Sequence, residues 1–167
     1  MSCLSCLKSV KRTAENTRPL VSPWKCDISF VIDRSGSMES MKYQTIEGTI
    51  KFVDEQKKVS KETGTPTYLT IKTFDDKVET IPGFDSTNIF QVPEIDTSYL
   101  IPRRTTRLID TAYETIQEQQ ERLNNYYSEI PHEIKKLNPQ IVLIFALITD
   151  GQDNCSDRTG AELNQLL

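Results

Sequence analysis

Two apolar segments, each ending at an aspartate, constrain the fold of this chain more than any other feature. The first runs over 26–33 and ends with Asp33, and the second runs over 140–149 and is followed by Asp150. Apolar, β-branched runs of this length are typical of strands buried on both faces of a parallel sheet. Parallel strands share one carboxyl edge, where open α/β sheets bind ligands. Asp33 and Asp150 are therefore expected at a common binding edge.

Helical periodicity separates these two strands and follows the second one. A helix over 39–58 is expected to bury Tyr43, Ile46, Ile50 and Val53, and the Gly-Thr-Pro sequence at 64–66 ends the segment. A second helix starting near Thr106 is expected to bury Leu108, Ala112, Ile116 and Leu123. Pro131 kinks or breaks that helix before a short helical turn, and 161–167 begins a last helix.

Residues 68–74 alternate in polarity, and Asp75-Asp76 supplies a tight turn into a second short strand over 77–81. This pattern predicts a hairpin whose second strand is antiparallel to the first. Residues 84–104 are predicted to be mostly loop. The sum is four strands in an α/β fold: a doubly wound, Rossmann-like, mostly parallel sheet with an antiparallel edge strand.

The length, composition and net charge of the chain fit one globular domain and restrict the kinds of partner it can bind. The chain has 167 residues, 37% hydrophobic and 26% charged, with a formal net charge of −4. A mildly acidic balance argues against broad nucleic-acid binding, which needs a basic face. No apolar run is long enough to span a bilayer. The flexible leader 1–24 has no secretory signal pattern, so a cytoplasmic location is expected, and its Cys3 and Cys6 are interpreted as exposed thiols.

Five oxygen donors are expected to meet at the carboxyl edge. Ser35 and Ser37 follow Asp33 in the turn Arg-Ser-Gly-Ser, and Thr106 opens the second helix. Together the predicted metal ligands are Asp33, Ser35, Ser37, Thr106 and Asp150. A donor set of hard oxygens, without His or Cys, suits Mg²⁺, or alternatively Mn²⁺ or Ca²⁺.

Three motifs resemble those of von Willebrand factor type A (vWA) domains. Asp33-Arg-Ser-Gly-Ser-Met38 resembles the family's DxSxS signature, Thr106-Arg-Leu-Ile-Asp110 its TxLxD segment, and Leu147-Ile-Thr-Asp-Gly151 its strand end. The resemblance covers residues 26–167. It implies a metal-ion-dependent adhesion site, MIDAS, in which Ser35, Ser37 and Thr106 bind the ion directly and the two aspartates act through water. A sixth position would accept a Glu or Asp carboxylate from a partner protein.

Two departures from the family pattern matter. Arg103-Arg104 stands where the family often has glycines, so Thr105 remains an alternative to Thr106, which is preferred for its spacing to Asp110. The family usually has about six strands. The domain at 25–167 is therefore expected to lack its last strands and helix, leaving 140–149 as an apolar edge unless a second chain completes the sheet.

Other readings of the same residues stay open. A metal-dependent phosphatase-like enzyme would use Asp33 as nucleophile, and a truncated remnant would bind nothing. A hydrolase triad and a phosphate-binding loop are disfavoured because neither GxSxG nor GxxxxGK[ST] is present, so no enzymatic activity is predicted. Asp110 is interpreted as structural, and Asp153 and Asn154 as solvated turn residues.

Overall fold

In the part of the chain that the structure describes, five strands form one sheet in the order β3-β2-β1-β5, with β4 pairing with β2. The computed structural model describes residues 24–103 and 105–167, so the predicted leader up to residue 23, with Cys3 and Cys6, lies outside the described residues. The strands are β1 (Lys25–Asp33), β2 (Thr67–Phe74), β3 (Val78–Thr80), β4 (Thr87–Asn88) and β5 (Ile141–Ile148). β1 pairs in parallel with β2 and β5, whereas β3 and β4 run antiparallel to β2.

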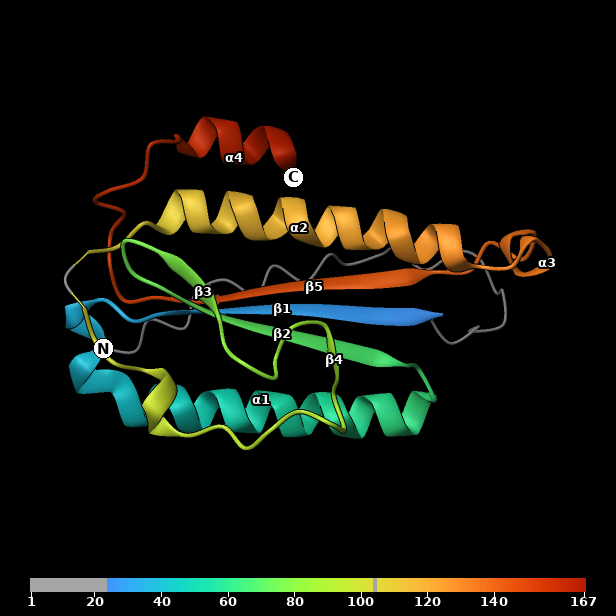
Figure 1. Ribbon diagram of the computed structural model, residues 1–167, viewed down its shortest axis with the longest axis horizontal. Coiled ribbons are helices and arrows are strands. Elements are labelled where there is room, and N and C mark those ends of the chain that lie inside the picture. Colours follow the sequence, from blue (N-terminus) through green and yellow to red (C-terminus); the bar gives the residue numbers. More distant parts are fainter. Residues whose placement is uncertain (1–23, 104) are drawn as a thin grey trace, which may run out of the picture.

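Helices lie on both faces of this sheet. They are η1 (Gly36–Met41), α1 (Lys42–Thr63), η2 (Thr97–Tyr99), α2 (Leu108–Glu129), α3 (His132–Lys135) and α4 (Gly160–Leu166). α1 covers one face, and α2 covers the other with α4 outside it (Figure 1). The predicted α/β class with a mostly parallel sheet and an antiparallel hairpin is confirmed. β4 was not predicted, because two residues in a loop carry no periodicity.

The face toward α1 holds the apolar core. Alternate residues of β1, namely Ile28, Phe30 and Ile32, are buried there with Leu69 and Ile71 of β2. Phe52 of α1 packs against Phe30 with ring centroids 4.9 Å apart. The predicted buried stripe of α1 is wrong at two positions, since Tyr43 is 76% and Ile50 39% exposed. Thr45 and Thr49 are buried instead. The Thr49 hydroxyl bonds to the Thr45 carbonyl, so its burial leaves that hydroxyl with a partner.

The face toward α2 is polar near β1 and β2. Asp27, fully buried on β1, accepts hydrogen bonds from Arg122, Gln119 and Tyr126 of α2. The Lys72 ammonium of β2 pairs with Glu118 of the same helix. α2 is thus docked through directional contacts as well as apolar packing. It begins at Leu108, two residues later than predicted, and ends before Pro131 as predicted.

β5 lies at one edge of the described sheet, where it pairs with β1. Its eight residues are all apolar and all half-buried, unlike those of β1, because within the described sheet it has a neighbour on one side only. The expected apolar edge at 140–149 is confirmed for the described residues. None of the described helices is long and apolar enough to cross a membrane.

Candidate metal centre

Asp33 and Asp150 meet at the carboxyl edge of two adjacent parallel strands. The register pairs Ile32 of β1 with Ile148 of β5, so both strands end at the same level. In Figure 1 both strands run toward the left side of the view, where the chain also enters α2. The Thr149 hydroxyl donates a 2.6 Å hydrogen bond to Asp33 Oδ2 and ties the two strand ends together. The predicted shared edge is confirmed.

The Ser-Gly-Ser turn continues this arrangement toward Asp150. The Ser35 backbone N–H donates to Asp33 Oδ1 at 2.6 Å, which folds the turn back over the strand end. The Ser35 and Ser37 hydroxyl oxygens are 3.1 Å apart. The Ser37 hydroxyl in turn donates to Asp150 Oδ1 at 2.8 Å. Ser35, Ser37 and Asp150 therefore form a chain of linked side-chain oxygens, and Asp33 joins this chain through the Ser35 backbone N–H.

Thr106 joins this chain through the space beside Gly151. A Cβ atom added to Gly151 would lie 3.5 Å from Thr106 Oγ1 and 3.8 Å from Asp33 Oδ2. The two oxygens thus border one small space, and Thr106, rather than Thr105, is the threonine found there. The hydrogen bonds that Thr106 makes with described residues involve its backbone N–H and C=O, which leaves the hydroxyl free for another ligand.

The oxygen separations fit a small divalent ion. Adjacent ligands of an octahedral ion bound at about 2.0–2.1 Å lie about 2.9 Å apart. The Ser35 and Ser37 hydroxyl oxygens, 3.1 Å apart, are close to that spacing. No group of three or more His, Cys, Asp or Glu side chains suited to a metal occurs in the described residues; the predicted set has only two such side chains.

Among the described residues, Asp33 is the fully buried aspartate without a cationic partner. Asp27 pairs with Arg122 at 3.0 Å and Asp75 with Arg34 at 2.6 Å. Asp110 pairs with both Arg107 and Arg158. Asp33 is equally buried, yet no ion pair among the described residues involves it. A buried carboxylate is costly unless it is paired or binds a metal. Within the described residues, Asp33 therefore lacks the charge compensation that each of the other three aspartates has.

Contacts with the β2–β3 hairpin fix the turn that carries Ser35 and Ser37. The Arg34 guanidinium binds Asp75 at the β2–β3 turn, and the Arg103 N–H donates to the Arg34 carbonyl at 2.8 Å. Burial alone would raise the pKa of Asp75, but hydrogen bonds, including those from Lys77 and Arg34, outweigh it and lower the pKa. A Cβ on Gly36 would lie 3.1 Å from the Arg103 carbonyl, so close approach explains the glycine.

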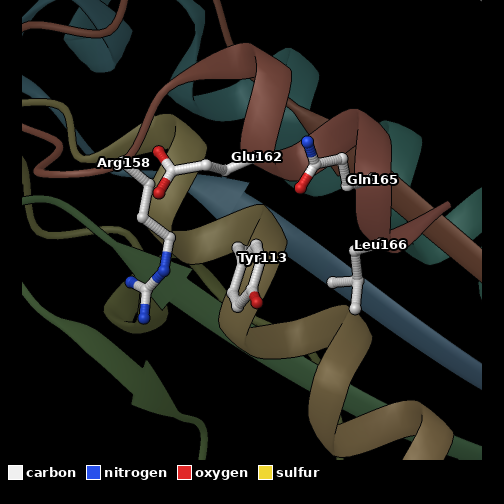
Figure 2. A pocket seen from close by; sticks show the side chains of 5 residues that line it. All are labelled: Tyr113, Arg158, Glu162, Gln165 and Leu166. Carbon is white, nitrogen blue, oxygen red and sulfur yellow. The ribbon is translucent and has the colours of Figure 1, made fainter.

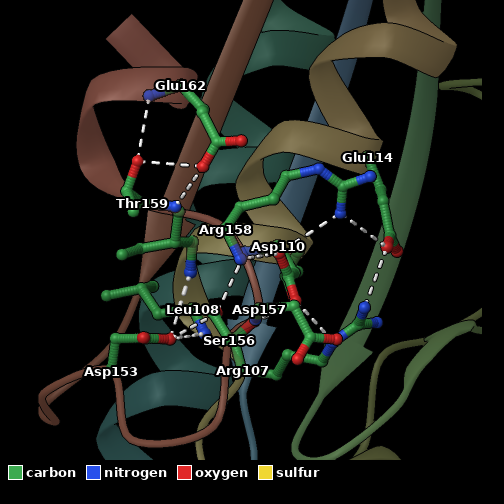
Figure 3. Close-up of polar contacts among 12 residues, drawn as sticks. Arg107, Leu108, Asp110, Glu114, Asp153, Ser156, Asp157, Arg158, Thr159 and Glu162 are labelled. Carbon is green, nitrogen blue, oxygen red and sulfur yellow. Dashed lines mark hydrogen bonds and ion pairs between the residues drawn. The ribbon is translucent and has the colours of Figure 1, made fainter.

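The loop after β5 caps the amino end of α2. Arg107, at the N-cap position, makes no side-chain cap. Instead Asp153 Oδ1 accepts the Leu108 N–H at 2.8 Å, and the Ser156 hydroxyl accepts the Asp110 N–H at 3.1 Å (Figure 3). The prediction of Asp153 as a solvated turn residue is wrong. Thr105 and Thr106 precede the helix in the sequence as ordinary capping residues, so no local signal pointed to a cap from the distant loop.

Asp110 makes the reciprocal contacts and has the structural role predicted for it. Its carboxylate accepts the backbone N–H groups of Asp157 and Arg158 at 2.8 Å and 3.0 Å. It also pairs with Arg107 and with the Arg158 side chain (Figure 3). Burial would raise the pKa of Asp110, but these donors and cations together lower it. The loop over 153–158 and the start of α2 therefore hold each other in place.

A polar cleft lies between α2 and α4, beside this loop. Figure 2 shows Tyr113 of α2 with Arg158 and Leu166 on either side of it. The Arg158 guanidinium lies over the Tyr113 ring, 4.4 Å from its centroid. None of the residues that line this cleft belongs to the predicted metal site. The cleft is a consequence of how α4 attaches to α2.

Comparison with known proteins adds no family or relative that would define the site. No protein-family model matches the chain, and a search of curated proteins finds no match.

Proposed function

We propose that this chain is a protein-binding module that depends on a divalent metal ion. Asp33, Ser35, Ser37, Thr106 and Asp150 would hold Mg²⁺, or Mn²⁺ or Ca²⁺, and the ion would accept a Glu or Asp carboxylate from a partner protein. The observation that carries the proposal is Asp33, which is fully buried without a cationic partner among the described residues. Asp33 Oδ1 accepts the Ser35 backbone N–H, and Asp33 Oδ2 borders the space beside Gly151 together with the Thr106 hydroxyl.

The composition of the site favours capture of an acidic ligand. Three of its five oxygen groups are neutral hydroxyls, so they leave the ion with much of its positive charge. A carboxylate from outside can then supply charge that the chain itself withholds. Because such a ligand would complete the shell, binding would require the metal and would be lost with a chelator.

The fold is part of the same proposal. A vWA-like, doubly wound arrangement is supported by the position of β1 between β2 and β5 and by helices on both faces. The resemblance of three sequence segments to vWA domains supports it as well. Asp33, Ser35 and Ser37 follow β1, Asp150 follows the adjacent strand β5, and Thr106 precedes α2.

The enzymatic alternative has weaker support. A nucleophilic aspartate needs a free oxygen that substrate can reach. Asp33 is fully buried, and its two oxygens accept bonds from the Ser35 N–H and the Thr149 hydroxyl. This arrangement suits a residue that organises a site more than one that attacks a phosphoester. Turnover of a generic phosphoester that requires Mg²⁺ and disappears in Asp33→Asn would reverse this conclusion.

The test combines metal binding with partner capture. Titration calorimetry with Mn²⁺ and Mg²⁺ is expected to show one site in the unaltered chain and none in the double variant Ser35→Ala, Ser37→Ala. Ser128→Ala, which changes an exposed serine near the end of α2, serves as the matched control. Partner proteins retained in Mg²⁺, released by chelator and absent from the double variant would support the proposal. Metal affinity unaffected by the double substitution would refute it.

A further inference from the structure

Asn154 and Thr106 are joined by two backbone-directed hydrogen bonds. The Asn154 side-chain oxygen accepts the Thr106 N–H at 2.9 Å, and the Asn154 N–H donates to the Thr106 carbonyl at 3.1 Å. Both polar groups of the Thr106 backbone are thereby occupied by one residue of the loop after β5. The side chain of Thr106, nearly fully buried, is left to face the space beside Gly151.

The loop that provides Asn154 also contains Asp150, and it is fixed independently of Thr106. Asp153 caps α2, and Asp110 accepts the N–H groups of Asp157 and Arg158. Two of the proposed ligands, Thr106 and Asp150, therefore belong to segments that are tied to each other. Asn154 is the direct link between the fixed loop and the threonine.

The residues that flank Thr106 in the chain are fixed by the serine turn and the β2–β3 hairpin. The Arg103 N–H donates to the Arg34 carbonyl at 2.8 Å, and the Arg107 N–H donates to the Asp75 carbonyl at the same distance. Residues on both sides of Thr106 thus bond to the turn that carries Ser35 and to the β2–β3 hairpin. Removing the Asn154 side chain would release only the contact that orients the Thr106 backbone N–H.

We infer that Asn154 is a positioning residue of the metal site, acting on the ion through Thr106. The inference rests on the proposed function. Asn154 itself need not touch the metal: it sets the backbone of Thr106 so that the hydroxyl lies near Asp33 before the ion arrives. Residues that orient metal ligands in this way typically change metal affinity by about 10- to 100-fold when they are lost.

A double-mutant cycle on Mn²⁺ affinity tests this role. Asn154→Ala is expected to weaken Mn²⁺ binding about tenfold in the unaltered background. In a Thr106→Ala background the same substitution is expected to change affinity little, since no hydroxyl remains to be positioned. Asn154→Asp keeps the accepting oxygen and is expected to retain affinity. Asp157→Ala is the control within the loop, because Asp157 contributes its backbone N–H to Asp110.

The outcomes separate this inference from the proposed function. If the unaltered chain binds no Mn²⁺, both are overturned. If it binds Mn²⁺ and Asn154→Ala binds equally well, the positioning role alone is overturned. Equal losses from Asn154→Ala with and without the Thr106 hydroxyl would also overturn it, as would an equal loss in Asn154→Asp. Circular dichroism in chelator identifies any variant that fails to fold, and the Asn154→Asp result then decides.

Discussion

The Ser37 hydroxyl donates a 2.8 Å hydrogen bond to Asp150 Oδ1, although the two residues lie 113 positions apart in the chain. The contact exists because β1 and β5 are parallel neighbours that end at the same level. It brings the serine turn and the second aspartate to one point, beside the buried Asp33. Metal binding should depend on that convergence and on the packing that supports it.

Divalent metal should stabilise the folded chain through Asp33. A ligand at a hundred times its dissociation constant adds about 2.7 kcal/mol to the free energy of unfolding when it binds only the folded state. The thermal midpoint should therefore rise with Mg²⁺ concentration, measured against matched ionic strength. Asp33→Asn should abolish this rise, whereas Asp157→Asn, at an exposed position, should preserve it. A chain with no Mg²⁺-dependent shift would match the reading as a non-binding remnant.

Gly151→Ala should lower the affinity for metal while changing the free energy of unfolding little. The added methyl meets Thr106 Oγ1 at 3.5 Å and Asp33 Oδ2 at 3.8 Å, which are ordinary contact distances. It would therefore fit the metal-free protein while filling the space between two proposed ligands. Calorimetric Mn²⁺ titration and denaturant unfolding in chelator measure the two effects separately.

Gly48→Ala is the matched control for this change. Gly48 lies within α1 with nothing near its added Cβ, so alanine should stabilise the helix by about 1 kcal/mol. It should leave Mn²⁺ affinity unchanged. If the two glycine substitutions lowered metal affinity equally, the space beside Gly151 would have no special role.

The buried contact between Asp27 and Arg122 should be essential for stability. Arg122→Ala would leave a fully buried carboxylate without its 3.0 Å cationic partner. Breaking a buried ion pair from one side costs about 3–5 kcal/mol. Glu62→Ala, which removes an exposed partner of Lys58 in α1, should cost less than about 1 kcal/mol. Urea unfolding of both variants gives the comparison, and similar losses in the two would contradict the polar docking of α2.

Acid should release the contacts of Asp110. The pKa of Asp110 in the folded chain lies below its ordinary value of 3.8. A lowered folded pKa contributes stability that is present above the ordinary value and is lost as the pH falls through the folded one. The free energy of unfolding in chelator should therefore favour the unaltered chain over Asp110→Asn at pH 6. That advantage should shrink steadily below pH 3.8; a constant difference would contradict it.

The local sequence pattern predicted the helices and strands well, but it predicted less well which of their residues are buried. Gly64, in the left-handed region at φ 68°, ends α1 where the sequence predicted a stop. The face that α1 buries was misjudged because Thr49 satisfies its own hydroxyl within the helix, which no hydropathy pattern records. Likewise Asp153 was read as a turn residue, since a helix cap supplied from 45 residues away has no local signature.

The ends of the two apolar strands, and the oxygen-bearing residues that follow them, could be predicted from the sequence because strand burial and turn chemistry are local properties. Parallel pairing then made the meeting of Asp33 with Asp150 predictable. Tertiary contacts place the Thr106 hydroxyl and Asp33 Oδ2 around the same space beside Gly151, and they let Asn154 bond to the Thr106 backbone. The tertiary structure also showed Asp33 buried without a cation among the described residues, whereas Asp27, Asp75 and Asp110 each have an arginine. Such pairings depend on distances between segments far apart in the chain, which no spacing along the chain encodes.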